Sequence, residues 1–197
     1  ATHPDADHSA GLISVLRRYR VDIFMRSSVS GDTPTWSLLL EEVVRTGSRV
    51  VVAERGQIVE LGYGAYIEVL APDRSVPKLE TNTACVVLRV VYETTSFMLP
   101  CDAPQTVEKY LVSLDGTNLK SDVLKAGHHG SRTSSAPLFV GHVDPAWVVF
   151  SRGCDNSYGF PHQETVDTYA QFGIGVLDTC ERGTIVFESD GQSVQLR

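Results

Sequence analysis

Four potential metal ligands lie close together at the start of the chain: His3, Asp5, Asp7 and His8. Their nitrogen and oxygen donors suit zinc, manganese or iron better than a site that selects for thiolates. The spacing His-x-Asp-x-Asp-His is too tight for one face of a helix, so we expect a short loop to bring the donors together. The structural alternative is that Asp5 and Asp7 precede a helix, where acids are favoured, and that His3 is an exposed loop histidine.

Two further groups of candidate ligands follow predicted strands. Asp102 stands just past one strand and just before a helix, where α/β enzymes often carry functional groups, although capping of that helix explains its position equally well. His128 and His129 leave another strand between Gly127 and Gly130, and the glycines permit a tight bend that would let both imidazoles reach one point.

One edge of a sheet could gather the three groups, because each comes at the exit of a predicted strand. Donors that converge in this way suggest two metal ions sharing a carboxylate, an arrangement that activates a bridging water and binds a phosphoryl or acyl oxygen. His162 ends a polar loop over residues 156–162 and either lines this site or caps the next helix. His142 follows Gly141 in an unpatterned loop and is expected at the surface.

Alternating helices and strands would position these groups. Helices are predicted over 9–20, 34–46, 104–114 and 164–172, with a brief one after Ser134. Strands are predicted over 21–25, 50–53, 58–61, 66–70, 84–92, 96–99, 123–126, 146–151, 175–178, 184–188 and 193–196. We interpret the runs from 50 to 70 as a meander, 75–80 as a polar loop and Asp190-Gly191 as a hairpin turn. In the helix over 104–114 the apolar stripe is Val107, Tyr110, Leu111 and Leu114.

Composition is typical of a globular domain. The 197 residues are 42% hydrophobic and 21% charged, and they contain no internal repeat or linker, so a single domain over residues 1–197 is predicted. The formal net charge of -7 argues against a broad basic face for nucleic acid, although metal ions can make an active site locally positive. No apolar run approaches the ~20 residues that cross a bilayer.

The four cysteines lie far apart, without the C-x-x-C spacing of zinc sites or the density of a disulfide framework. We therefore predict that all of them are buried thiols: Cys85, Cys101, Cys154 and Cys180.

Several motifs together resemble the metallo-β-lactamase superfamily, and within it the hydrolase-like C-terminal domain of ComEC-type proteins of DNA internalisation. They are THPDADHSAGL at 2–12, VVLRV at 86–90, LPCD at 99–102, DVLKAGHHGSRTSS at 122–135, SRGCDNSYGFPH at 151–162 and ERGTI at 181–185. The HHGS segment is the most specific of these motifs, and the resemblance covers nearly the whole chain.

The resemblance implies an α/β fold, the αββα metallo-β-lactamase-like sandwich, with two divalent metal ions, Zn²⁺ or Mn²⁺, at one sheet edge. His3 and Asp5 would bind one metal, Asp7 and His8 the other, and Asp102 would bridge them. A histidine after the following strand would complete the ligand set of the second metal. Either His128 or His129 fits, and His128 is favoured because it directly follows Gly127.

Three residues depart from the superfamily pattern. Asp5 stands where histidine is more widespread, which shifts the site toward manganese. Cys101 replaces the glycine before the bridging aspartate and would alter the tight turn. Phe160 replaces a histidine of the usual G-H-P-H loop and leaves only His162. The first strands of the family's domain also have no counterpart here, so an N-terminally truncated domain is expected.

The resemblance implies a metal-dependent hydrolase that acts as a nuclease on incoming DNA, with Asp7, His8, Asp102 and His162 as catalytic residues. Ser131 or Arg132 would contact the scissile group. The alternatives are a two-metal hydrolase of another ester or lactone and a degenerate domain that only binds metal or DNA. The expected partners are DNA and the rest of a membrane-embedded uptake protein at the bacterial inner membrane, facing outward. No small-molecule cofactor is expected.

Overall fold

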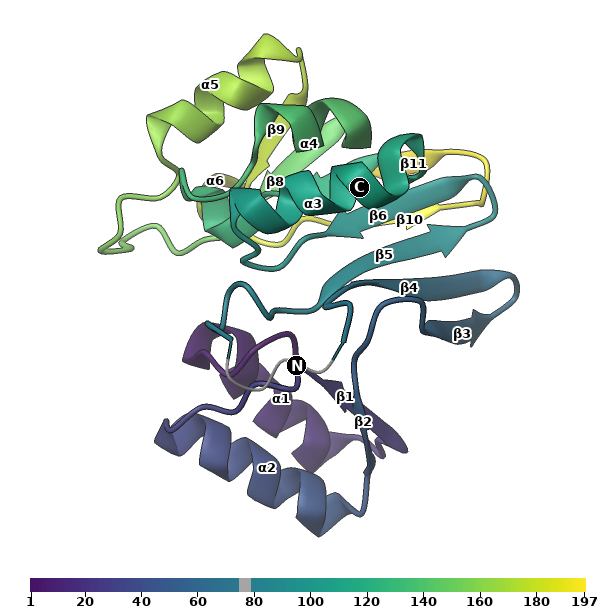
Figure 1. The fold of residues 1–197 in the computed structure, drawn as a ribbon, viewed down its shortest axis with the longest axis vertical. Helices are drawn as coiled ribbons and strands as arrows, with labels where there is room; N and C mark the ends of the chain where they lie inside the picture. Colours follow the sequence, from purple (N-terminus) through teal and green to yellow (C-terminus); the bar gives the residue numbers. More distant parts are fainter. Residues whose placement is uncertain (75–78) are drawn as a thin grey trace. The chain divides into compact units, whose positions relative to one another are not determined.

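The computed structural model describes residues 1–74 and 79–197. The polar loop predicted over 75–80 therefore lies largely outside the described residues. The chain forms two compact units: the first unit comprises Ala1–Gln57 and Val69–Val87, and the second unit comprises Ile58–Glu68 and Leu88–Arg197 (Figure 1). The prediction of one domain over the whole chain stays a prediction, and each unit is described by itself.

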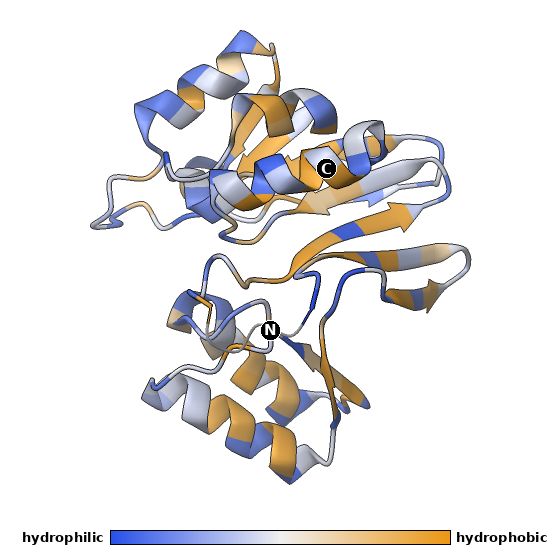
Figure 2. Ribbon diagram, in the orientation of Figure 1, coloured by the Kyte–Doolittle hydropathy of each residue, from blue (hydrophilic) through white to orange (hydrophobic). Residues whose placement is uncertain are grey.

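The first unit contains two helices and a pair of parallel strands. They are α1 (Ala6–Arg18), β1 (Ile23–Arg26), α2 (Pro34–Thr46) and β2 (Arg49–Val52). Its core is formed by Leu16, Phe24, Trp36, Leu39 and Val43. Figure 2 shows that α1 and α2 each carry both hydrophobic and hydrophilic residues, as expected for helices that bury one face.

Local signals set the ends of α2 where the sequence predicts them. The Thr33 hydroxyl accepts a hydrogen bond from the Trp36 N–H at 3.2 Å, and Pro34 occupies the first turn. Gly47 ends the helix in the left-handed conformation with φ 69°. The predicted helix over 34–46 is thus confirmed.

A mixed sheet forms the body of the second unit. Its strands, in spatial order, are β3 (Ile58–Gly62), β4 (Ala65–Ala71), β5 (Val87–Tyr92), β6 (Thr95–Leu99), β7 (Val123–Lys125), β8 (Trp147–Phe150) and β9 (Gly175–Asp178). Pairing is antiparallel between β5 and β6 and parallel from β6 to β9. The last residues of β4 continue into the first unit. Asp102 follows the end of β6 in sequence, and His128 and His129 follow the end of β7.

Helices flank this sheet (Figure 1): α3 (Gln105–Asp115), α4 (Pro137–Val143), α5 (Gln163–Gln171) and α6 (Thr179–Arg182). A separate hairpin of β10 (Phe187–Ser189) and β11 (Val194–Leu196) follows. The predicted turn between them is confirmed, since Asp190 accepts the backbone N–H groups of Gln192 and Ser193 at 2.9 and 2.7 Å.

Several element predictions are wrong. α1 begins at Ala6 instead of Ser9, the strand over 84–92 begins at Val87, and α6 was not predicted. β2 pairs with β1 and not with β3, so residues 50–53 are not part of a meander. His142 lies in the last turn of α4 and not in a loop.

The buried stripe of α3 also differs from the prediction. Leu111 is buried as predicted, but Tyr110 and Leu114 are 46% and 45% exposed. Their place in the interior is taken by Glu108, whose side chain is fully buried. The stripe is thus rotated around the helix, which puts a carboxyl group into the core.

Among the described residues, the longest helices are 13 residues long, and none combines the length and apolar character that crossing a bilayer would need.

Candidate functional site

The opening motif of the first unit is only partly a loop. Asp5 has extended backbone angles and stands at the N-cap of α1, while Asp7 and His8 lie in its first turn. The prediction that all four donors lie in a loop is therefore wrong for Asp7 and His8. The Ser9 hydroxyl donates to the Asp5 carbonyl at 2.8 Å, which fixes the start of the helix.

The motif side chains form two close pairs within the first unit. His3 Nε2 lies 3.6 Å from Asp5 Oδ2, and His8 Nε2 lies 3.4 Å from Asp7 Oδ2. The two imidazoles are neighbours, with ring centroids 4.2 Å apart. His3 is buried, which excludes the alternative of an exposed loop histidine, and the carboxylates of Asp5 and Asp7 are 50% and 63% exposed.

The second unit contains the adjacent histidines in an unusual turn at Gly127–Gly130. Both have left-handed backbone angles, with φ 47° at His128 and φ 55° at His129. Main-chain hydrogen bonds hold this conformation: the His128 N–H donates to the Cys101 carbonyl at 3.0 Å, and the Ser131 N–H donates to the His128 carbonyl at 2.8 Å. A conformation that costs energy for a non-glycine residue is therefore imposed by its surroundings.

The two imidazoles face the same carboxylate. His128 Nε2 and His129 Nε2 lie 3.5 and 3.6 Å from Asp102 Oδ2, and the Asp102 side chain is only 5% exposed. Lys125 on β7 approaches the other oxygen, with Nζ 3.5 Å from Oδ1. Sequence reasoning missed Lys125, although its place two residues before Gly127 at a strand end was a usable signal.

The second ring nitrogen of each histidine has a different partner. His129 Nδ1 lies 2.6 Å from the Ser151 carbonyl oxygen, which can only accept, so Nδ1 carries the proton. In neutral His129 the lone pair is then on Nε2, beside Asp102. His128 Nδ1 lies 3.2 Å from the Thr133 hydroxyl, which can donate or accept and fixes no tautomer.

Cys101 lies in a tight turn directly before Asp102. It is buried and takes φ 57°, a conformation that glycine adopts without strain. The Ala103 N–H donates to the Pro100 carbonyl at 3.2 Å across this turn. The expectation that cysteine alters the turn relative to the superfamily stays a prediction.

His162 is oriented by the neighbouring turn. It stands at the N-cap of α5, but its side chain makes no capping hydrogen bond. Instead, the ring Nδ1 of His162 accepts a hydrogen bond from the backbone N–H of Arg132 at 3.1 Å. The backbone N–H of His162 donates to the Gly130 carbonyl at 2.9 Å. His162 is thus the N-cap residue of α5 by position, but its side chain does not cap the helix. Because Nδ1 accepts a hydrogen bond, neutral His162 carries its proton on Nε2 as a donor.

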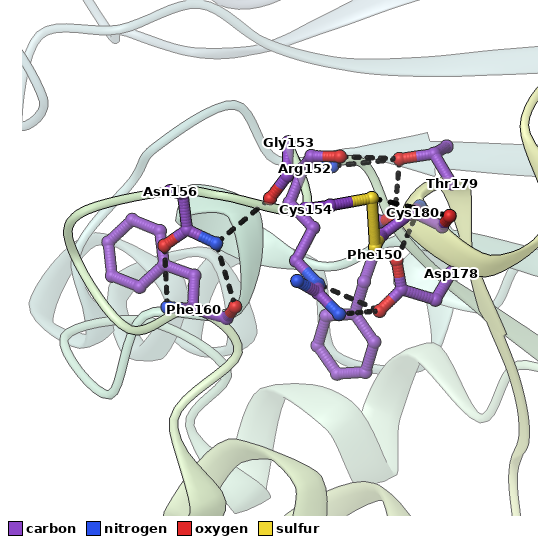
Figure 3. Close-up of a disulfide and its surroundings, with 9 residues drawn as sticks. All are labelled: Phe150, Arg152, Gly153, Cys154, Asn156, Phe160, Asp178, Thr179 and Cys180. Carbon is purple, nitrogen blue, oxygen red and sulfur yellow. Dashed lines mark hydrogen bonds and ion pairs between the residues drawn. A yellow bond between two sulfur atoms is a disulfide. The ribbon is translucent and has the colours of Figure 1, made fainter.

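A disulfide between Cys154 and Cys180 ties the loop after β8 to α6 (Figure 3). The prediction of buried thiols holds for Cys85 and Cys101 but is wrong for these two cysteines. Their pairing needs a loop to approach a helix, and the two cysteines lie 26 residues apart in sequence, so the sequence contained no local signal for it.

Two polar links stiffen the same loop (Figure 3). Arg152 pairs with the Asp178 carboxylate, with Nη2 to Oδ2 at 2.7 Å and Nε to Oδ2 at 2.8 Å. The Asn156 side chain accepts the Phe160 N–H at 2.8 Å and donates to the Phe160 carbonyl at 3.0 Å. Asn156 thereby holds both backbone polar groups of Phe160, the N–H and the carbonyl.

Glu108 on α3 holds the segment that follows the histidine turn. Its two oxygens accept the backbone N–H groups of Ser135 and Ala136 at 2.8 and 2.6 Å. A Cβ on Gly127 would lie 3.1 Å from Glu108 Oε1 and 2.8 Å from the Ser134 Cβ, so only glycine fits there. Burial raises the pKa of Glu108 to about 7, although those two N–H groups lower it. Sequence reasoning missed this residue.

The predicted ligands therefore form two groups. Asp102, His128 and His129 meet within the second unit, whereas the opening motif forms its pairs within the first unit. That both groups share one metal centre stays a prediction.

Comparison with known proteins finds competence proteins. The chain is 27% identical over 186 residues to ComE operon protein 3 of Bacillus subtilis, which covers 94% of this chain and 24% of that protein. It is 35% identical over 124 residues to the competence protein ComA of Neisseria gonorrhoeae and 30% identical over 122 residues to recombination protein 2 of Haemophilus influenzae, covering 63% and 62% of this chain. The chain spans a quarter or less of the length of these relatives. No family model matches it.

Solved structures show the same fold. CmlA, a diiron beta-hydroxylase from Streptomyces venezuelae, matches 90% of this chain and 42% of its own with a TM-score of 0.57 at 15% identity. A variant of CmlA matches with a TM-score of 0.52. Likeness at this identity concerns the fold alone. The fold is thus mixed α/β and metallo-β-lactamase-like, and the homologues of the chain are competence proteins of the ComEC type.

Proposed function

We propose that the chain is a metal-dependent hydrolase of phosphodiester bonds that acts on DNA during competence-type uptake. The observation that carries the proposal is the arrangement in the second unit, where two imidazole nitrogens approach one buried carboxylate oxygen at 3.5 and 3.6 Å. The kinship with competence proteins supports DNA as the substrate.

The donor set fits zinc or manganese. Imidazole nitrogen and carboxylate oxygen are ligands for both ions. Because the Nδ1–H of His129 is hydrogen-bonded to a carbonyl, the Nε2 atom of neutral His129 is unprotonated and has its lone pair beside Asp102. A carbonyl that fixes the tautomer of a ligand histidine is a common support in metal sites. We therefore favour His129 over His128 as the ligand from this turn.

The ligands of two ions would be His3 with Asp5 and Asp7 with His8, with Asp102 between them and His129 completing the second set. Two such ions supply a water activated for attack and a Lewis acid for the phosphoryl oxygen. Lys125, 3.5 Å from Asp102, compensates the charge of this buried carboxylate and holds it in place.

His162 would bind the substrate as a hydrogen-bond donor. Its Nδ1 is occupied by the Arg132 N–H, so neutral His162 offers Nε2–H to the phosphate or to the leaving oxygen. Arg132, 65% exposed, supplies a positive charge for the DNA backbone. Ser131 is buried and its hydroxyl is engaged with Thr133 at 3.0 Å, so it would support the turn instead of contacting the scissile group.

The disulfide supports a location on the outer side of the membrane. Disulfides persist in oxidising compartments and are rare in the cytosol. The bond between Cys154 and Cys180 thus fits a domain that meets DNA before it enters the cell, attached to the rest of a membrane-embedded protein.

The test is metal content and cleavage of a labelled single-stranded oligonucleotide after removal of metal and addition of Zn²⁺ or Mn²⁺. We expect two ions per chain and metal-stimulated cleavage, lowered more than about 100-fold by Asp102→Asn or His129→Ala. His142→Ala is the matched control, because this histidine bonds to the Leu138 carbonyl in α4 outside the site.

Three results would contradict parts of the proposal. A protein that neither retains metal nor cleaves with added metal would be a non-catalytic domain. Cleavage of lactones or thioesters without cleavage of DNA would refute the substrate. Loss of the bound metal in His128→Ala but not in His129→Ala would reverse the assignment of the ligand.

A further inference from the structure

The loop after β8 exposes an aromatic ring beside the candidate ligands. Tyr158 is 72% exposed and stacks on Phe160, with ring centroids 5.3 Å apart and an interplanar angle of 16°. We call this pair, Tyr158 with Phe160, the aromatic shelf. An exposed ring held parallel to a second ring offers one flat face to a ligand.

The inner ring of the shelf contacts the histidines of the site. Phe160 is nearly parallel to His129, at 17° with centroids 6.4 Å apart. It meets His128 and His162 edge to face, with centroids at 5.5 and 5.2 Å. Tyr158, Phe160 and His129 therefore form a continuous series of rings that ends at the carboxylate of Asp102.

The shelf is fixed before any ligand arrives. Asn156 bonds to both the N–H and the carbonyl of Phe160, and the disulfide at Cys154 anchors the preceding residues to α6 (Figure 3). A surface that is already ordered loses less conformational entropy on binding than a mobile loop would.

We propose that the aromatic shelf binds a base of single-stranded nucleic acid by stacking on Tyr158, and so presents the strand to the histidines around Asp102. This inference rests on the proposed function and names the form of its substrate. Stacking is tolerant of sequence, because every base has a flat face. A chain with a net charge of -7 is also poorly suited to bind mainly through the phosphates, which favours recognition through the bases. Bases of a duplex are already stacked on each other, so the shelf selects single strands.

The charges around the shelf agree with recognition through bases. Asp155 is exposed on the same loop, and the exposed Arg132 lies near Glu164, with Nη1 to Oε1 at 3.8 Å. Positive charge is therefore partly offset here, and contacts to the phosphates alone would be weak.

The test is binding of a fluorescein-labelled 12-residue oligothymidylate to the 197-residue chain in EDTA, followed by anisotropy. Tyr158→Ala is expected to weaken binding about 5- to 150-fold, the equivalent of about 1–3 kcal/mol, and Tyr158→Trp to preserve it. Tyr63→Ala is the matched control, because Tyr63 is 98% exposed in the turn between β3 and β4. An unlabelled 12-residue abasic strand, which has phosphates without bases, is expected not to compete.

Equal binding by the native chain and Tyr158→Ala would overturn the proposal, as would equal competition by the abasic strand or by a duplex of the same sequence. Because the measurement is made without metal, it is independent of hydrolysis. Tyr158-dependent binding without metal-stimulated cleavage would support the shelf and refute the nuclease. Metal-stimulated cleavage together with binding that does not depend on Tyr158 would support the nuclease and refute the shelf.

Discussion

Glu108 should make the stability of the protein depend on pH in a direction opposite to that of most carboxyl groups. Its side chain is fully buried, and burial raises its pKa to about 7 from the ordinary 4.5. The perturbation is Glu108→Gln, which keeps the shape of the side chain but cannot ionise. Its amide presents one oxygen and one NH₂ to the N–H groups of Ser135 and Ala136, so one of these donors loses its acceptor.

The sign and size of the effect follow from the shift. Below pH 4.5 Glu108 is protonated in both the folded and the unfolded chain. Between pH 4.5 and 7 the unfolded chain loses the proton while the folded chain keeps it, so the free energy of unfolding falls as pH rises. A difference of about 2.5 pKa units corresponds to about 3 kcal/mol, lost in full above pH 7. The unpaired N–H costs the Gln variant about 1–3 kcal/mol at all pH values.

The assay is urea unfolding of both chains in EDTA between pH 4.5 and 8, followed by far-ultraviolet circular dichroism. Other groups titrate in this range, but they contribute equally to both proteins and cancel in the difference. Native protein should be the more stable at pH 5, and its advantage over Glu108→Gln should shrink by about 3 kcal/mol by pH 8. Parallel curves, or an advantage that grows with pH, would refute this account of the buried carboxyl.

Two further predictions concern stability. Replacing both Cys154 and Cys180 with serine should lower the free energy of unfolding by about 3.5 kcal/mol, the loop entropy for a separation of 26 residues. Dithiothreitol should destabilise only the native chain, and an equal effect on the serine variant would contradict the assignment. Gly130→Ala should cost about 2–4 kcal/mol in urea unfolding, because φ is 93° and a Cβ would lie 2.6 Å from the Pro161 Cβ. Gly153→Ala, which meets nothing within 4 Å, should be neutral, and similar losses in both variants would refute the steric explanation.

Elements with strong local signals were predictable from the sequence. The ends of α2 follow from a capping hydroxyl at Thr33 and a left-handed glycine at Gly47, both of which act within a few residues. The hairpin around Asp190 likewise depends on side chain to backbone bonds across three residues. Such features need no knowledge of the rest of the fold.

Features set by distant contacts were not predictable. The run at 50–53 has the composition of a strand, but its partner, β1, is decided by packing in the first unit. Glu108 interrupts the expected apolar stripe of α3 because the donors it satisfies, on Ser135 and Ala136, lie 27 and 28 residues away. Periodicity cannot reveal a buried carboxyl whose partners come from another segment.

The candidate site shows the same division. Residue types and strand exits predicted that Asp102 and the two adjacent histidines would meet, and they do. The choice between His128 and His129 stays a prediction. The sequence favours His128 from its place after Gly127, whereas our proposal of His129 rests on its hydrogen bond to the carbonyl of Ser151, 22 residues away, which no local pattern could indicate.

The two left-handed histidines also restrict how this segment can evolve. Asparagine, aspartate and histidine are the non-glycine residues that tolerate φ values near the 47° and 55° found at His128 and His129. Aspartate and asparagine are therefore the substitutions that keep the backbone, and both carry a side-chain oxygen of a kind that manganese accepts. Histidine alone adds a ring nitrogen, the donor that suits zinc better. If the proposed metal site exists, relatives that keep it should carry histidine, aspartate or asparagine at the position of His129, whereas glycine would keep the turn without any donor.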